Sequence, residues 1–257
     1  MKIKRAIISQ PTPAELEKSP YYFLTKKYNI KVDYFKFFQI EGLTSLEFRQ
    51  QKVSLFEYNA VIFTSKHSVD HYFRIAKEIR FDIPEEMKYF CISEAIALYL
   101  QKYTSFRKRK NLHANLSPKE LIELIKKHRS EKFFLPTSEN VGSETDALKE
   151  AMIRYNVTHA SAAMYRSIPS DLSALNPDDY EMFVLFSPVG VQGFSSSFPD
   201  FVQGERIIAA YGKGTQEALT QIGLTVNIPA PIPTAQSMPA AIEAYLAKIM
   251  KPRRKSS

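Results

Sequence analysis

Six short apolar runs, spread along the whole chain, limit the folds that this sequence can adopt. Each run holds four or five residues and is apolar almost throughout. This pattern is typical of parallel strands that are covered on both faces of a sheet. The runs are Ala6–Ser9, Ala60–Thr64, Tyr89–Ile92, Phe133–Pro136, Phe183–Phe186 and Ile207–Tyr211.

Helical patterns follow several of these runs. Ser117–Glu120 forms a capping box with proline at the first helical position, and Thr215–Ile222 ends at Gly223, a common helix stop. Another stripe has the three- and four-residue spacing of an amphipathic helix, with Val69, Tyr72, Phe73, Ala76 and Ile79. The alternation of strand and helix predicts an α/β fold with parallel sheets flanked by helices.

Two extended segments interrupt this alternation, Lys31–Ile40 and Val157–Ser167. Neither has a helical pattern, and each lies between groups of strand–helix units. We therefore expect two domains joined by two extended linker strands. The expected parts are a discontinuous first domain of residues 1–35 and 168–257, a second domain of residues 41–160, and linkers at residues 36–40 and 161–167.

An internal similarity supports two related domains. Val61–Val69 resembles Val184–Val191, since in both an apolar strand leads into hydroxyl residues and then a helix. Each is followed by a strand, a polar turn and a helix, at Phe90–Leu100 and Ala209–Leu219. The letters differ, but the order of the elements is the same.

Two basic clusters account for the formal net charge of +8. They are Arg107–Lys110 and the basic residues of the tail Lys251–Ser257, and without them the positive and negative side chains are equal in number. A protein that is basic throughout is therefore excluded, and we expect no nucleic-acid partner. RNA or DNA binding through these two clusters remains an alternative, although no aromatic side chains interrupt the clusters as nucleic-acid binding would favour.

The chain has no apolar stretch that predicts a membrane span. Its longest apolar runs, Met182–Phe186 and Ile207–Tyr211, are far below the roughly 20 residues required. Residues 1–8 lack the features of a signal peptide. Cys91 is the one cysteine, which excludes an intramolecular disulfide, and its apolar neighbours predict a buried thiol. We expect a cytoplasmic protein.

Polar turns follow five of the predicted strands. In a parallel sheet such turns lie at the carboxyl edge, where helix N-termini offer free N–H groups to anions. Serine and threonine there are also ordinary helix caps, and five such turns together favour a site for a polyanion. The candidate binding residues are Thr64, Ser65, Lys66, His67, Ser68, Ser93, Thr137, Ser138, Ser187, Pro188, Gly190, Gly212, Lys213, Gly214 and Thr215.

The sequence does not match the known motifs for binding a dinucleotide or a metal ion. The turn at Gly212–Thr215 begins like a dinucleotide-binding fingerprint, but Glu217 stands where the third glycine belongs. His67 and His71 have a spacing that can hold a metal on a helix, yet no cysteine or third histidine is close to them in sequence. We expect a structural helix there and no metal or nucleotide.

In their order along the chain, several of these turns resemble the uroporphyrinogen-III synthase family. The matching segments are Phe63-Thr64-Ser65, Phe186-Ser187-Pro188, Gly212 to Thr215 followed by Ala218 and Leu219, Pro233-Thr234, and Tyr165 in the second linker. Each segment is short, and the resemblance depends on their order over nearly the whole chain. It adds Thr234 to the candidate binding residues.

The resemblance implies both a fold and a reaction. The fold is two similar α/β domains joined by two extended linkers. The reaction, in tetrapyrrole (haem) biosynthesis, is the cyclisation of hydroxymethylbilane to uroporphyrinogen III with inversion of ring D and loss of water. The resemblance implies no cofactor, and we expect a monomer whose partner is this substrate.

The chemistry explains why the sequence has no obvious catalytic dyad. The electron-rich pyrrole assists loss of the hydroxymethyl oxygen, so the protein must mainly hold the substrate in one pose. Tyr165 is the candidate catalytic residue for assisting departure of the hydroxyl, and the alternative is a packed linker tyrosine. The chain departs from the family pattern at Ser93-Glu94-Ala95-Ile96, where the family usually has glycine, asparagine and threonine. A noncatalytic module that binds a tetrapyrrole or another polyanion is therefore the alternative function.

Overall fold

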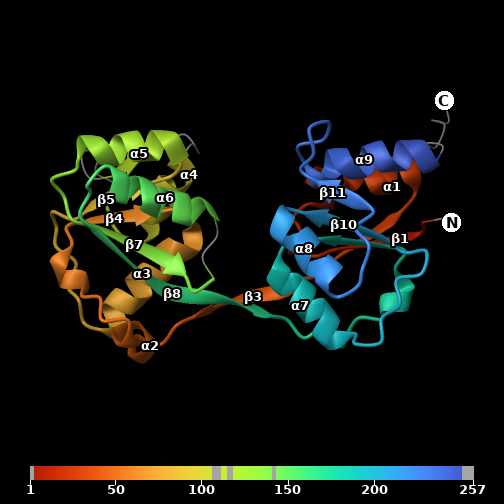
Figure 1. The fold of residues 1–257 in the computed structure, drawn as a ribbon, viewed down its shortest axis with the longest axis horizontal. Coiled ribbons are helices and arrows are strands. Elements are labelled where there is room, and N and C mark those ends of the chain that lie inside the picture. The colour runs from red at the N-terminus through yellow and green to blue at the C-terminus, as the bar shows by residue number, and fades with distance from the viewer. Residues whose placement is uncertain (1–2, 106–110, 115–117, 141–142, 251–257) are drawn as a thin grey trace. The chain divides into compact units, whose positions relative to one another are not determined.

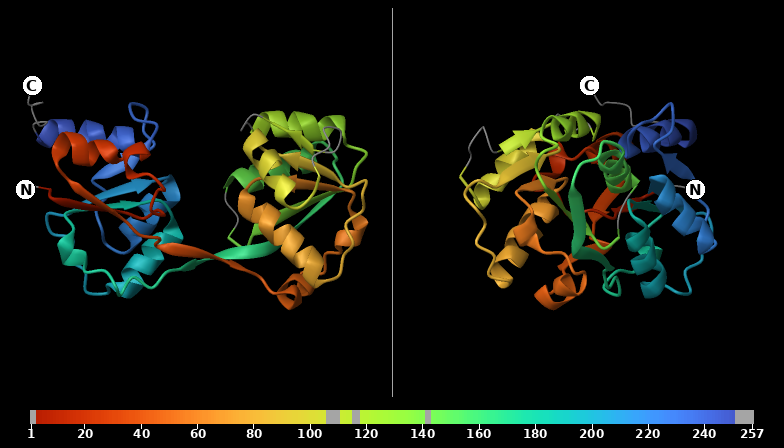
Figure 2. Two further views of the ribbon diagram at one scale, coloured as in Figure 1. Left: turned by 180° about the vertical axis from the view of Figure 1, so that it is seen from behind. Right: turned by 60° about the vertical axis from the view of Figure 1, so that its left-hand side comes forward.

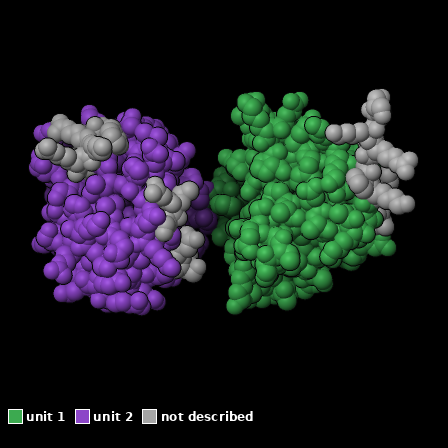
Figure 3. Space-filling view, turned by 90° about the horizontal axis from the view of Figure 1, so that it is seen from above, with its two compact units in different colours: residues 1–39, 168–257 green, residues 40–167 purple. Residues whose placement is uncertain are grey.

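The computed structural model of the protein describes residues 3–105, 111–114, 118–140 and 143–250. The predicted basic clusters at Arg107–Lys110 and in the tail Lys251–Ser257 lie outside these residues, as does Ser117 of the predicted capping box. The chain divides into two compact units (Figure 3). Unit 1 is Met1–Gln39 with Ile168–Ser257, and unit 2 is Ile40–Ser167.

Unit 1 contains a five-stranded sheet with the strand order β11-β10-β9-β1-β2. Each neighbouring pair runs parallel, and Ile7 lies opposite Phe183 in the central pair. The strands are β1 (Arg5–Ile8), β2 (Lys31–Tyr34), β9 (Met182–Leu185), β10 (Ile207–Tyr211) and β11 (Ile228–Ala230).

Helices cover both faces of the unit 1 sheet (Figure 1). One face packs against α1 (Tyr22–Tyr28) and α9 (Met238–Ile249), through side chains such as Ile8 and Leu24. The other face packs against α7 (Pro188–Ser197) and α8 (Lys213–Gln221), through Ile7 and Phe194. Short 3-10 turns lie at Leu16–Lys18 and Pro177–Asp179. Because strand side chains alternate between faces, the apolar runs bury both faces, as the sequence predicts.

Unit 2 contains a six-stranded sheet with the strand order β3-β8-β7-β4-β5-β6. The pairs β4–β5, β4–β7, β5–β6 and β7–β8 run parallel. The strands are β3 (Phe38–Gly42), β4 (Ala60–Phe63), β5 (Lys88–Cys91), β6 (Asn111–His113), β7 (Phe133–Ser138) and β8 (His159–Pro169).

The layers of unit 2 repeat those of unit 1, as Figure 2 shows from two further directions. One face of the sheet packs against α2 (Ser45–Gln50), α3 (Lys66–Glu78) and α4 (Glu94–Tyr99). The other face packs against α5 (Pro118–Lys127) and α6 (Ser143–Arg154). Short 3-10 turns lie at Leu55–Glu57 and Leu100–Lys102. The predicted class of two similar α/β arrangements is confirmed.

The six predicted strands are confirmed with ends that move by at most two residues. The segment Lys31–Ile40, for which the sequence predicts one extended piece, does not form a continuous strand. It breaks at residues 35–37 into β2 and the start of β3, because the ring of Phe37 turns into the core and stacks on Phe194 at 6.2 Å between centroids. The linker boundaries at 36–40 and 161–167 stay a prediction. Residues 36–39 group with unit 1, and residues 161–167 group with unit 2.

Two further features can be compared with the sequence analysis. Within the described residues, no helix has both the length and the apolar character that crossing a membrane requires. The Cys91 thiol is fully buried, as predicted, and its burial raises the pKa of the thiol to about 12.

Candidate functional site

Parallel pairing places the predicted polar turns at one edge of each sheet. In unit 2, the strands β4, β5 and β7 run the same way, so the turns at Thr64–Ser68, Ser93 and Thr137–Ser138 share the carboxyl edge. In unit 1, the parallel strands β9 and β10 bring the turns at Ser187–Gly190 and Gly212–Thr215 to a common edge. Each unit therefore gathers its candidates where α/β proteins bind ligands.

Ser65 is the N-cap of α3 and lies at the centre of the unit 2 group. Its Oγ accepts a hydrogen bond from the Ser68 N–H at 3.0 Å, and the Ser68 hydroxyl accepts one from the Ser65 N–H at 3.2 Å. The Ser68 hydroxyl also donates to the Ser65 carbonyl at 2.7 Å and is fully buried. Ser68 is thus committed to the cap, whereas the Ser65 oxygen has capacity for another partner.

That further partner of Ser65 is Tyr165. The Tyr165 hydroxyl lies 3.2 Å from Ser65 Oγ, although the two residues are 100 positions apart in the chain. Tyr165 belongs to β8 and is 8% exposed. Burial raises the pKa of its phenol, and the hydrogen bond with Ser65 opposes that rise. Tyr165 is consequently a neutral phenol at physiological pH, held at the positive end of the α3 dipole.

Two imidazoles of α3 flank the ring of Tyr165. The ring of His71 stacks on it with centroids 5.2 Å apart and planes 21° apart, and the ring of His67 lies tilted at 6.0 Å. His67 is exposed and His71 is half-buried. Their four-residue spacing, considered above for a metal, instead places both rings against one tyrosine. Among the described residues, no group of three or more His, Cys, Asp or Glu side chains is arranged to hold a metal ion.

The other unit 2 candidates lie on neighbouring turns. Thr64 is half-buried between β4 and α3, and the ammonium of the exposed Lys66 lies 5.1 Å from the centre of the Tyr99 ring. Ser93 is buried and caps α4, where its Oγ accepts the Ile96 N–H at 3.4 Å. Glu94 is the first residue of α4 and is exposed.

Thr137 and Ser138 line a separate pocket of about 560 Å³ beside β7 and β8. The pocket also contains Glu47, Gln51 and Lys149. Thr137 is buried, and Ser138 Oγ has no hydrogen-bond partner among the described residues. Both residues are therefore placed at the carboxyl edge of the sheet, and Ser138 in β7 lies opposite Tyr165 in β8.

In unit 1, Ser187 caps α7 as Ser65 caps α3. Its Oγ accepts the Gly190 N–H at 2.9 Å, and Pro188 is the first residue of the helix. Gly190 is buried, and the β-carbon of Phe37 lies 3.3 Å from the position that a β-carbon of Gly190 would take. The N-terminus of α7 is thus closely packed on one side.

The second helix start of unit 1 lies directly beside the first. Gly212 enters α8 with a positive φ of 82°, and a β-carbon on Gly214 would be 3.4 Å from Pro188. Lys213 is 91% exposed and lies 3.4 Å from Glu217, whereas Thr215 is buried. The starts of α7 and α8 are therefore neighbours.

Thr234 lies in an exposed turn between Ile232 and Ala235, before the helix α9. The cap of that helix is Ser237, whose Oγ accepts the Ala240 N–H at 3.4 Å.

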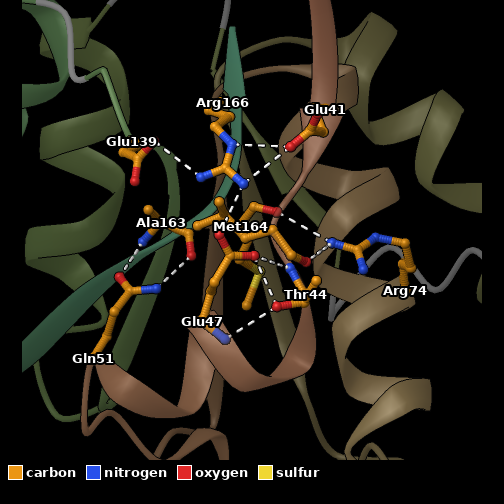
Figure 4. Close-up of polar contacts among 10 residues, drawn as sticks. Glu41, Thr44, Glu47, Gln51, Arg74, Glu139, Ala163, Met164 and Arg166 are labelled. Atoms are coloured by element: carbon orange, nitrogen blue, oxygen red, sulfur yellow. Dashed lines mark hydrogen bonds and ion pairs between the residues drawn. The ribbon is translucent and has the colours of Figure 1, made fainter. Parts of the chain in front are cut away.

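The sequence alone did not point to Arg74 or Arg166 as part of this region. Arg166 lies next to Tyr165 in β8 and pairs with Glu41, Glu47 and Glu139 (Figure 4). Arg74 donates from Nε to His71 Nδ1 at 3.2 Å. The spacing of His71 and Arg74 on one helix was the available signal, but their orientation toward Tyr165 depends on the packing of β8.

The family model described as "Uroporphyrinogen-III synthase HemD" matches residues 35–240. None of the curated proteins matches the chain.

Solved structures are also similar to the chain. The crystal structure of uroporphyrinogen-III synthetase from Helicobacter pylori aligns with a TM-score of 0.57 and 17% identity, over 96% of this chain and 100% of that one. A mutant uroporphyrinogen III synthase from the extremely thermophilic bacterium Thermus thermophilus aligns with a TM-score of 0.49 and 12% identity, over 96% of this chain and 98% of that one. The similarity to the Helicobacter structure shows the fold.

Proposed function

Since the chain belongs to the uroporphyrinogen-III synthase family, we propose that Tyr165 and the capped helix starts of the two units carry out the reaction of that family. That reaction closes hydroxymethylbilane to uroporphyrinogen III, with inversion of ring D and loss of water. The observation that carries the proposal is the Tyr165 hydroxyl held against Ser65 at the start of α3.

The first step is departure of the hydroxyl group as water. The C–O bond breaks with its electron pair going to oxygen, the Tyr165 phenol supplies the proton, and the pyrrole is left as an azafulvene cation. Burial keeps the pKa of Tyr165 above its ordinary value, so the proton is present when it is needed. General acid catalysis of this kind contributes about 10²–10⁴-fold in rate.

Ser65 stabilises the phenolate that forms during this step. One lone pair of Ser65 Oγ is used by the Ser68 N–H, so the hydroxyl proton of Ser65 is free to point at the phenolic oxygen. In that arrangement the Tyr165 O–H can donate to the substrate. The positive end of the α3 dipole favours the developing negative charge, and the cation formed on the substrate favours it further.

Helix starts bind the carboxylates of the substrate, which carries acetate and propionate on every ring. The starts of α7 and α8 present backbone N–H groups side by side, and the exposed Lys213 adds a positive charge. Backbone donors of this kind bind carboxylates without a basic surface, which agrees with the charge balance of most of the chain. In unit 2, Thr64, Ser93, Thr137 and Ser138 occupy the corresponding edge.

Holding the substrate decides which product forms. Ring D attacks the azafulvene carbon through its substituted position, and the resulting spiro intermediate fragments and closes again. The final loss of a proton from carbon restores aromaticity and returns the proton that Tyr165 gave up. Because the free substrate also closes without inversion, the pose imposed by the protein determines the isomer.

An assay that resolves the product isomers tests the function. The purified protein, supplied with hydroxymethylbilane, is expected to yield mainly the type III isomer, measured by chromatography of the oxidised porphyrins. A parallel reaction without protein gives the uncatalysed type I background. Formation of type I alone in the presence of protein would contradict the proposal.

The family match does not favour the alternative of a noncatalytic binding module. We further propose a monomer in the cytoplasm that has no nucleic-acid partner. The buried, unpaired thiol of Cys91 and the charge balance outside the two basic clusters support this proposal. Sedimentation of the protein with and without duplex DNA would test both the oligomeric state and the absence of nucleic-acid binding.

A further inference from the structure

Residues on both sides of Tyr165 in β8 contact side chains from other elements (Figure 4). Gln51 makes a two-point contact with Ala163, since its amide donates to the Ala163 carbonyl at 2.8 Å and accepts the Ala163 N–H at 2.7 Å. Arg166, on the other side, pairs with Glu41 at 3.0 Å and Glu47 at 2.8 Å. The main chain is thus bound at Ala163, and the side chain of Arg166 is anchored on the other side of Tyr165.

Arg74 of α3 connects this backbone with the aromatic stack. Its Nη2 donates to the Leu43 carbonyl at 2.6 Å and to the Met164 carbonyl at 3.3 Å, the latter drawn in Figure 4. Its Nε donates to His71 Nδ1 at 3.2 Å. Its Nη1 faces outward and pairs with Glu78. One guanidinium therefore binds the carbonyl preceding Tyr165 and the imidazole stacked on Tyr165.

The hydrogen bond from Arg74 determines which ring nitrogen of the neutral His71 carries the proton. Because Nε–H of Arg74 is a donor, Nδ1 of His71 must accept, so the neutral ring carries its proton on Nε2. Burial lowers the pKa of His71, and the charges of Arg74 and His67 lower it further against the opposing effect of Asp70 and Glu78. The neutral ring is the form that stacks face to face on the Tyr165 phenol.

Gly42 shows how closely β3 is packed against this pair. A β-carbon at Gly42 would lie 2.7 Å from Arg74 Nη2 and 2.8 Å from His71 Nδ1, well inside van der Waals contact. Gly42 lies in the extended backbone of β3 and does not have a positive φ. Its backbone conformation therefore does not itself require glycine. The missing side chain therefore provides the space in which Arg74 and His71 meet.

We propose that Arg74 and His71 are positioning residues for Tyr165, which together hold the phenol in the orientation from which it donates its proton. This inference rests on the catalytic role proposed for Tyr165. The hydrogen bond between Ser65 and Tyr165 restrains the phenolic oxygen, and by itself it does not fix the plane of the ring. The stack with His71 restrains the plane of the ring, and Arg74 fixes both the stack and the backbone that carries the ring.

Three single variants separate the contacts. Arg74→Met removes every hydrogen bond of the guanidinium, His71→Phe keeps an aromatic ring on Tyr165 but cannot accept from Arg74, and Gly42→Ala pushes on both residues. Each is expected to lower kcat about tenfold with KM within about twofold of wild type. Glu78→Gln is the matched control, since it removes the outward ion pair of Arg74 alone, and it is expected to keep the wild-type kcat.

The decisive comparison combines Arg74→Met with Tyr165→Phe. If Arg74 acts through Tyr165, the double variant is no slower than Tyr165→Phe alone. An equal tenfold loss in both backgrounds would overturn the proposal, because Arg74 would then act by another route. Circular dichroism and thermal unfolding of each variant show whether it folds, and His71→Phe keeps the proposal testable should Arg74→Met fail to fold.

A spectroscopic measurement tests the positioning without using activity. With ¹³Cζ-labelled tyrosine, the signal of Tyr165 is assigned as the one that is lost in Tyr165→Phe. We expect this signal to shift in Arg74→Met and in His71→Phe and to stay in place in Glu78→Gln. An unchanged Tyr165 signal in both variants would overturn the proposal. A wild-type rate for Tyr165→Phe would instead contradict the catalytic role, so the two failures are distinguishable.

Discussion

The start of α3 in unit 2 and the start of α7 in unit 1 are built alike but used differently. Both follow a buried parallel strand, and both begin with a serine whose Oγ accepts the N–H of the third residue after it, Ser68 in α3 and Gly190 in α7. In unit 2 the capping Ser65 also reaches the hydroxyl of Tyr165. Ser187 contacts Gly190, and Phe37 packs beside it.

The difference is clearest one turn further along each helix. His71 and Gly193 stand at the same distance from their caps. The imidazole of His71 fills the space between α3 and Tyr165. A β-carbon at Gly193 would lie only 2.7 Å from the Phe37 carbonyl, so the backbone of residues near Phe37 and Ser170 occupies that space in unit 1. The start of α3 in unit 2 is therefore occupied by a tyrosine and an imidazole, and the start of α7 in unit 1 by backbone.

The second helix starts differ in charge as well. The first residue of α4 is Glu94, and the first residue of α8 is Lys213. Both side chains are exposed. A cation at this position adds to the attraction of a helix N-terminus for a carboxylate, whereas an anion opposes it. Under the proposed function, we therefore expect the start of α8 to bind a carboxylate better than the start of α4.

The largest expected effect is that of Tyr165→Phe, which removes the proton donor of unit 2. We expect kcat to fall by about 100-fold or more, because the departing hydroxyl loses its general acid. Thermal unfolding should be close to wild type, since the ring and its stack remain. Tyr155→Phe, at an exposed tyrosine, is the matched control and should retain activity. A wild-type kcat for Tyr165→Phe would show that Tyr165 is not the proton donor and that unit 2 does not differ from unit 1 in this respect.

Gly193→Ala tests whether α7 requires the absence of a side chain where α3 has His71. The new β-carbon would meet the Phe37 and Ser170 carbonyls, so we expect a loss of about 1–3 kcal/mol in the free energy of unfolding. Gly214→Ala is the matched control, because its β-carbon would make only an ordinary contact with Pro188 and stability should change by no more than about 1 kcal/mol. Equal losses in both, measured by urea unfolding, would refute this explanation.

Substitutions at the first residues of α4 and α8 test whether these two helix starts differ in their binding of carboxylates. Lys213→Glu is expected to raise KM for hydroxymethylbilane about two- to fivefold, and Glu94→Gln to lower it by a smaller factor. Both effects should shrink as the salt concentration rises, since these charges are exposed. A KM that does not respond to either substitution at low salt would show that these helix starts do not bind the carboxylates.

The smallest effect concerns acid stability in unit 2. Hydrogen bonds from the Thr44 N–H and hydroxyl, and then from Arg166, lower the pKa of Glu47 from its ordinary value of 4.5 to about 2. The ionised Glu47 therefore stabilises the folded state above pH 4.5, and that contribution is lost as the pH falls from 4.5 toward 2. Urea unfolding at pH 6 and pH 3 should show a smaller acid loss in Glu47→Gln than in wild type. Equal losses would exclude Glu47 as a source of acid sensitivity.

Much of the fold could be predicted because its signals are local. The six apolar runs become strands, and Ser65, Ser93 and Ser187 become N-caps, since each stands between an apolar strand and an amphipathic stretch. The three-residue strands β6 and β11 were too short to show a period. The division of Lys31–Ile40 was missed because the burial of Phe37 depends on Phe194, far along the chain.

The candidate site was predictable in its turns but not in its partners. Ser65 and Tyr165 could be named separately, from the turn and from the family resemblance, but nothing local indicates that they share a hydrogen bond across 100 residues. His71 was considered for a metal and stacks on Tyr165 instead. The role of Arg74 is not evident from the sequence, because two of its acceptors, the Leu43 and Met164 carbonyls, belong to segments distant from α3 in the chain.

The sequence by itself determined the parallel strands, the capped helix starts and the family, because hydrophobic period, capping chemistry and motif order are properties of neighbouring residues. Only the tertiary structure decided which helix start would hold a tyrosine. β8 and β3 carry Tyr165 and Gly42 to α3, where Ser65, His71 and Arg74 are already spaced along one helix. Contacts of that kind form between segments distant in sequence, so they exist only once the sheet has brought its strands together.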